Sequence, residues 1–167
     1  MILEKFKSKK FTFGEKVEFW AVKEIMENRK FLISIIEYLN SDFFESRTAS
    51  IVVDVVKTYF KKYADIPPIE IIQAESKNFL TPKDDIELFN TELKKITELK
   101  LEEGEKQYVK DNTVALCQYN ALKLALYESA EILLDESGDI PTDYVGTINE
   151  KIKKAVSIAE QKDLGLN

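Results

Sequence analysis

Hydrophobic residues recur every three or four positions along most of this chain, a pattern typical of amphipathic helices. In the first hundred residues the pattern predicts helices over residues 15–28, 31–39 and 47–63, followed by a short helix that Pro68 begins and another that Asp84 or Asp85 caps. The β-branched run at 51–56 is also compatible with a strand. Its length and the lysines on its polar face favour a helix.

The second part of the chain predicts two longer helices. Residues 108–135 contain neither glycine nor proline, so one helix of roughly 40 Å can form at 1.5 Å per residue. Residues 136–142 predict a turn, and a further helix follows with apolar residues at nearly heptad spacing. We expect these helices to pack as an antiparallel hairpin. The expected seam consists of Leu122, Leu126 and Leu133 on the first helix and Val145, Ile148, Ile152, Val156 and Ala159 on the second.

The predicted fold is therefore all-α, with a compact N-terminal helical bundle followed by a long antiparallel helical hairpin. We expect the globular bundle at residues 1–107, the hairpin at 108–162 as an oligomerisation element, and the start of a linker at 163–167. Gly104 marks the expected junction between bundle and hairpin. Five glycines and four prolines are too few for a turn-rich β architecture.

A second apolar stripe interrupts the polar side of the long helix and consists of Leu116, Tyr127 and Leu134. One hairpin partner cannot cover this stripe and the seam at the same time. The stripe either packs on the N-terminal bundle or forms an interface between subunits. Apolar surface on two sides of such an appendage commonly leads to association.

Composition narrows the possible partners and compartments. The chain has 24 basic and 30 acidic residues, a net charge of −6, so no broad grip on DNA or anionic lipid is expected. The single cysteine, Cys117, cannot form an internal disulfide, which fits a reducing compartment. The N-terminus lacks a long apolar stretch, and we expect neither a signal peptide nor a membrane span. The expected location is the cytoplasm.

The sequence also limits the chemistry. It contains no histidine, which excludes catalytic triads with an imidazole base and metal sites with imidazole ligands. No glycine begins a Walker-type or Rossmann-type phosphate loop. We therefore predict no catalytic residue, cofactor or metal ion in this chain. Paired acids such as Asp84 and Asp85 fall at predicted helix ends, where acids are common, and Cys117 is expected to be a small buried hydrophobe.

Several segments, in order, resemble the N-terminal domain of DnaB-type replicative DNA helicases, and most of all the branch found in tailed phages. They are the hydrophobic stretch 31–36 with 39–44 after it, the aromatic and basic stretch 59–70 with its Ile66-Pro67 turn, and the chain end at 154–165. The helix at 110–134 contributes the pattern Asp111, Gln118, Ala121, Leu122, Ala125 and 128–132. The resemblance covers about residues 16–166.

The resemblance implies the collar of a hexameric helicase, in which helical hairpins pair between subunits above the ring of ATPase domains. It implies a homo-oligomer, as dimer units or a hexameric ring, docking of primase or a helicase loader, and weak or no DNA binding by this domain. ATP and Mg²⁺ would belong to the parent's motor domain, which this chain lacks, so the chain alone is not expected to be an enzyme. A phage-encoded parent would act in the host cytoplasm.

The chain stops where the linker to the motor domain begins in that family, and we expect an excised domain. The alternative is a free-standing helical adaptor or regulator of a replication protein, which would have the same bundle and the same interfaces. A small enzyme that uses carboxylates and a hard cation is a third hypothesis, and it requires acids clustered in one concave pocket.

Overall fold

The chain folds into helices joined by short turns, which confirms the expected all-α class. The computed structural model describes residues 4–5, 14–135, 137–138 and 142–160, and all of their side chains except those of 158–160. The α-helices are α2 (Glu15–Glu27), α3 (Arg29–Ile35), α4 (Arg47–Tyr63), α5 (Ile69–Glu75), α6 (Ile86–Glu98), α7 (Glu103–Leu133) and α8 (Tyr144–Glu160), with short 3-10 helices η1 (Ser41–Phe43) and η2 (Ser76–Asn78). No strand occurs within these described ranges.

Side-chain caps explain where several helices begin. Asn28, Ser46 and Asp85 each accept a hydrogen bond from the backbone N–H three residues later, at the starts of α3, α4 and α6. Such bonds satisfy N–H groups that have no partner inside the helix. Asp85 is therefore the cap of α6. α4 ends at Tyr63, and the next residue, Ala64, adopts a left-handed conformation with φ of 55°, shortly before Pro67 and Pro68.

The β-branched run of α4 is helical because neighbouring elements cover the helix on several sides. Ile51, Val52, Val53, Val55 and Val56 are all buried, and α4 contacts α2, α5, α6 and the two 3-10 helices. A strand would need a neighbouring strand for its backbone hydrogen bonds, whereas a helix satisfies them internally. Packing thus outweighs the modest preference of these residues for strands.

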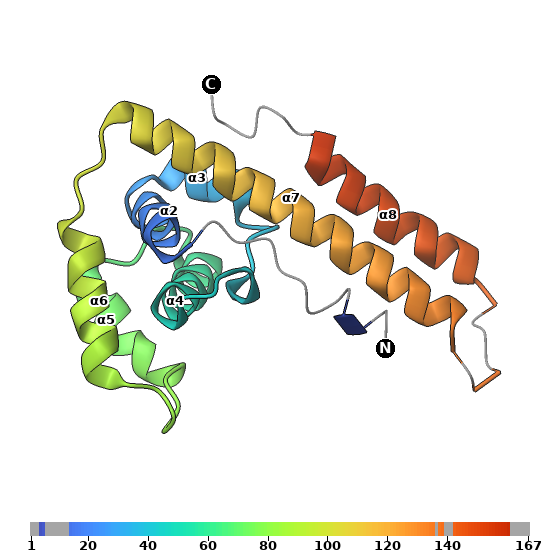
Figure 1. Cartoon of the computed structure of the whole chain (residues 1–167), viewed down its shortest axis with the longest axis horizontal. Coiled ribbons are helices and arrows are strands. Elements are labelled where there is room, and N and C mark those ends of the chain that lie inside the picture. The colour runs from blue at the N-terminus through green and yellow to red at the C-terminus, as the bar shows by residue number, and fades with distance from the viewer. Residues whose placement is uncertain (1–3, 6–13, 136, 139–141, 161–167) are drawn as a thin grey trace.

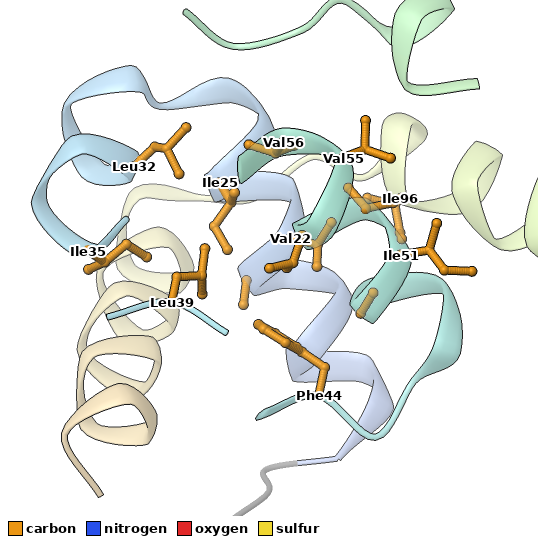
Figure 2. Packing of buried hydrophobic residues seen from close by; sticks show 14 of the residues in the cluster. Val22, Ile25, Leu32, Ile35, Leu39, Phe44, Ile51, Val55, Val56 and Ile96 are labelled. Atoms are coloured by element: carbon orange, nitrogen blue, oxygen red, sulfur yellow. The ribbon is translucent and has the colours of Figure 1, made fainter. Parts of the chain in front are cut away.

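One hydrophobic core joins α2, α3, α4, α5, α6 and the first half of α7. Figure 2 shows Val22 and Ile25 of α2 in the cluster that also contains Leu32 and Ile35 of α3 and Ile51 and Val56 of α4. Burying each such side chain contributes about 1.5–3 kcal/mol. We call α2–α6 with the first half of α7 the bundle.

The start of α7 differs from the expected one. The helix begins at Glu103 rather than Tyr108 and continues through Gly104, because Glu102 and Glu105 form a capping box around its first turn. Val109 and Cys117 belong to the core cluster of the bundle. The expected boundary after residue 107 therefore falls inside one continuous helix that is shared by both parts of the chain.

The long axis of the molecule is set by α7 (Figure 1). α8 lies beside its C-terminal part and runs in the opposite direction, while α5 and α6 lie at the other end of the molecule (Figure 1). We call α7 and α8 together the α7–α8 pair. Within the part of the chain that the structure describes, no helix has the length and apolar character needed to cross a membrane.

Candidate association surface

One face of α7 is buried and attaches the helix to the bundle. α7 contacts α2, α3 and η1 through this face. Thr113 and Asn120 are buried, and each donates to the carbonyl oxygen four residues earlier, at 2.7 and 3.0 Å. These bonds remove most of the cost of burying polar groups. α7 can therefore place polar residues against the bundle without destabilising it.

α8 packs mainly on α7. Ala155 is buried in this contact, and Ile148 and Ile152 are half-buried. Along one edge of the contact, Lys151 Nζ lies 2.6 Å from Glu128 Oε2. This edge faces the bundle, because Lys151 and Glu128 line a crevice together with Lys57 of α4. The other edge of the α7–α8 pair faces away from the bundle.

Four residues that the sequence placed in the hairpin seam lie on this outer edge instead. Leu133 and Val145 are 58% and 64% exposed, and Leu126 and Val156 are exposed as well. The remaining seam residues with described side chains, Leu122, Ile148 and Ile152, are half-buried. The side chain of Ala159 lies outside the described residues, as does the expected linker at 163–167. The seam is therefore narrower than the sequence predicts.

The seam is narrower than expected because of the way α7 is rotated about its own axis. Ala121 and Ala125 line the crevice that also contains Ala155 of α8, so this side of α7 is the one next to α8. At 100° per residue, Leu126 and Leu133 point roughly a third of a turn away from the two alanines. Small residues thus form the close approach of the two helices, and the leucines are left outside.

Apolar side chains that are exposed or, for Leu122, half-buried continue along the outer side of α7 beyond the part that α8 covers. They are spaced by three, four or seven residues, which places them on one side of the helix in a heptad pattern. We call this set the outer stripe: Tyr108, Ala115, Tyr119, Leu122, Leu126 and Leu133. Sequence reasoning missed Tyr108 and Tyr119, although their spacing from Leu122 and Leu126 carries the same signal.

The outer side of α7 also carries almost no charge. Within about 60° of the stripe's centre line, Asp111 is the only charged residue between positions 108 and 133. Charged residues make up 32% of the chain as a whole, so this side of α7 is unusual for the molecule. Low charge together with aromatic residues is typical of the centre of protein–protein interfaces.

Two of the three residues in the stripe that was expected at a subunit interface are buried. Leu116 and Tyr127 are only 1% and 8% exposed, whereas Leu134 is exposed. Tyr127 lines a crevice with Phe43 of η1, and its hydrogen bond with Glu131 raises the pKa of the phenol. Leu116 and Tyr127 are thus covered within the chain rather than left on its surface. Both residues lie on the face of α7 that turns toward the bundle.

Outside this surface, Cys117 is a buried thiol. Burial raises the pKa of the Cys117 thiol to about 12, so the thiolate is not populated at neutral pH. No three or more of the described Cys, Asp and Glu side chains are grouped so that they could hold a metal ion. The surface offers apolar contact rather than reactive groups. Comparison with known proteins found no matching family model, no matching curated protein and no matching solved structure.

Proposed function

We propose that this chain is the N-terminal collar domain of a hexameric replicative DNA helicase of the DnaB type, and that it associates with copies of itself through a helical hairpin formed by α7 and α8. The observation that carries this proposal is the outer stripe, an uncharged apolar line on the side of the hairpin that faces away from the bundle. The resemblance of the sequence to that domain supplies the biological context. ATP hydrolysis would then reside in a motor domain elsewhere in the parent protein.

The outer stripe supports association between copies for a physical reason. From Tyr108 to Leu133 it extends roughly 35–40 Å at 1.5 Å per residue. Heptad-spaced apolar residues along such a length form the seam of a helix–helix contact when a second helix covers them. Each leucine that becomes buried contributes about 1.5–3 kcal/mol, against which the entropy cost of association must be set.

A second copy is a suitable partner for this stripe. Two identical surfaces related by a two-fold axis bury the same residues on both subunits. Because the stripe has almost no charge, two copies can approach without like-charge repulsion. Leu126 and Leu133 on α7 would be joined in the contact by Val145 and Val156 at the outer edge of α8. Paired hairpins would give the dimer units from which a ring can form.

The remaining expectations belong to the same proposal. A collar that assembles in this way leaves the bundle available for primase or a helicase loader, and with a net charge of −6 it contributes little to DNA binding. The alternative, a free-standing adaptor of a replication protein, would use the same hairpin. A reading frame that continues past Asn167 into Walker motifs is the outcome expected for the helicase.

The association is tested by replacing Leu126 and Leu133 with glutamate in one variant. We expect the wild-type chain to sediment with a concentration-dependent mass of at least a dimer, and the double variant to sediment as a monomer with unchanged helicity. The matched control is Ile86→Glu with Leu88→Glu on α6, because these side chains are similarly exposed but lie outside the stripe. The control should keep the wild-type mass. A monomeric wild type at about 100 μM, or a control that dissociates equally, contradicts the proposal.

A further inference from the structure

We infer that the crevice between α4, α7 and α8 is a binding site for a small phosphorylated ligand of about the size of a mononucleotide. The crevice has a volume of about 310 Å³ and lies on the side of the α7–α8 pair that faces the bundle. Small-molecule sites usually start at roughly this size and combine apolar walls with a few polar groups. The inference is independent of the outer stripe, which lies on the other side of the pair.

Three lysines from two helices line this crevice. Lys57 comes from α4, and Lys151 and Lys154 come from one turn of α8. The same crevice contains two carboxylates, Glu37 and Glu128, and Glu128 pairs with Lys151. The crevice therefore has an excess of positive charge in a chain whose net charge is −6. Local potential of this sign attracts anions.

Lys57 is the group that an anion would stabilise most. Its side chain is half-buried, and its ammonium donates a hydrogen bond to the carbonyl oxygen of Leu39. Burial lowers the pKa of Lys57, and the nearby charge of Lys61 lowers it further, while Asp54 acts in the opposite direction. Its hydrogen-bond partner Leu39 is neutral, so the positive charge is incompletely compensated. An anion in the crevice would compensate it.

A phosphate group matches this arrangement better than a single carboxylate does. A phosphomonoester carries up to two negative charges and three acceptor oxygens, and each ammonium can donate a charge-assisted hydrogen bond to it. The walls formed by Tyr38, Phe43 and Leu124 are apolar and suit a flat ring attached to the phosphate. Lysines also act as phosphate ligands elsewhere, as compact point charges. The recognition needs no glycine-rich loop.

Binding should connect α8 to the bundle. α8 packs mainly on α7, whereas a ligand held by both Lys57 and Lys154 would link α8 to α4. Such a ligand binds the folded chain only, so it should raise the melting temperature in a concentration-dependent way. The ligand would then hold the orientation of α8 relative to the bundle.

Calorimetric titration of the full chain with AMP, inorganic phosphate and adenosine tests the inference, with thermal melts on the same samples. We expect AMP to bind one to one with a Kd of about 1 mM or below and to raise the melting temperature, and adenosine to bind at least about tenfold more weakly. Lys57→Gln and Lys154→Gln should each weaken AMP binding about tenfold. Lys154 is exposed, so its variant should fold even if the Lys57 variant does not.

The control is Lys95→Gln, an exposed lysine on α6 outside the crevice, which should bind AMP as the wild type does. Absence of AMP binding at about 10 mM, or equal weakening by Lys95→Gln and Lys154→Gln, overturns the inference. Adenosine binding as tightly as AMP overturns the role of the phosphate. Inorganic phosphate binding as tightly as AMP overturns the role of the ring.

Discussion

The bundle and the α7–α8 pair bury their apolar residues to very different extents. In the bundle, Val22, Ile25 and Ile51 are inaccessible to solvent. In the pair, Ala155 of α8 is buried, whereas Ile148 and Ile152 are half-buried and Val145 is largely exposed. The bundle thus closes its apolar core within one chain, while the pair leaves apolar surface exposed.

The difference follows from how many neighbours each helix has. α4 is surrounded by α2, α5, α6 and the two 3-10 helices, so that several of its sides are covered. α8 packs mainly on one helix, α7, and one neighbour covers only part of the circumference of a helix. A helix with one main neighbour, such as α8, therefore leaves part of its apolar surface exposed.

The largest effect on the free energy of unfolding is expected when an isoleucine is truncated to alanine in each of the two regions. Ile25→Ala creates a cavity in the closed core of the bundle and should lower the free energy of unfolding by about 2–5 kcal/mol. Ile152→Ala changes a half-buried site in the pair, where the surroundings are already open to solvent. It should therefore lower the free energy of unfolding by less than about half as much as Ile25→Ala does. Urea unfolding followed by circular dichroism, at a concentration where the chain is monomeric, measures both. Equal losses would show that the pair is packed as tightly as the bundle.

A smaller change in the free energy of unfolding is expected when Glu18, a buried carboxylate in the bundle, is replaced. Its Oε1 accepts a hydrogen bond from the Ser46 N–H at 3.1 Å, whereas its Oε2 is buried and has no hydrogen-bond partner. Burial raises the pKa of Glu18 above its ordinary value of 4.5. Glu18→Gln keeps the acceptor and removes the charge, so it should raise the free energy of unfolding at pH 7 by about 1 kcal/mol.

The pH dependence distinguishes this explanation from a general packing effect. Because the pKa of Glu18 is higher in the folded than in the unfolded chain, the folded chain holds the proton more tightly. Stability from this group is therefore present at low pH and is lost as the pH rises through the folded pKa. The gain from Glu18→Gln should shrink as the pH is lowered toward roughly 4. A gain that stays constant between pH 4 and pH 7 contradicts the role of the charge.

The smallest effect is expected at the charged edge of the α7–α8 pair. Lys151 and Glu128 are both about a third exposed, so a double-mutant cycle with alanine should give a coupling of about 0.2–1 kcal/mol that decreases in 1 M salt. The control pair is Lys106 and Glu103, at 3.4 Å and with Glu103 almost fully exposed, where the coupling should be close to zero. A larger coupling at the control pair would argue against partial burial as the cause.

Much of the secondary structure was predictable because it depends on local spacing and local caps. Residues 47–63 are helical with the expected bounds, and Asp85, one of the two expected caps, begins α6. Both signals lie within a few residues of the structure that they determine. The start of α7 was less predictable, because Gly104 usually weakens a helix, whereas here a capping box encloses it in the first turn.

The assignment of the apolar faces of α7 was decided by tertiary structure alone. The spacing along α7 identifies two apolar lines, one through Leu116 and Tyr127 and the other through Leu126 and Leu133, but both have the same period. Which line is buried depends on how α7 is rotated against the bundle and on where α8 packs, and these are set by contacts between residues distant in sequence. The crevice of Lys57 and Lys154 arises in the same way, from positions about a hundred residues apart. Local spacing therefore determined the helices, and only their packing decided which apolar and charged surfaces stay exposed.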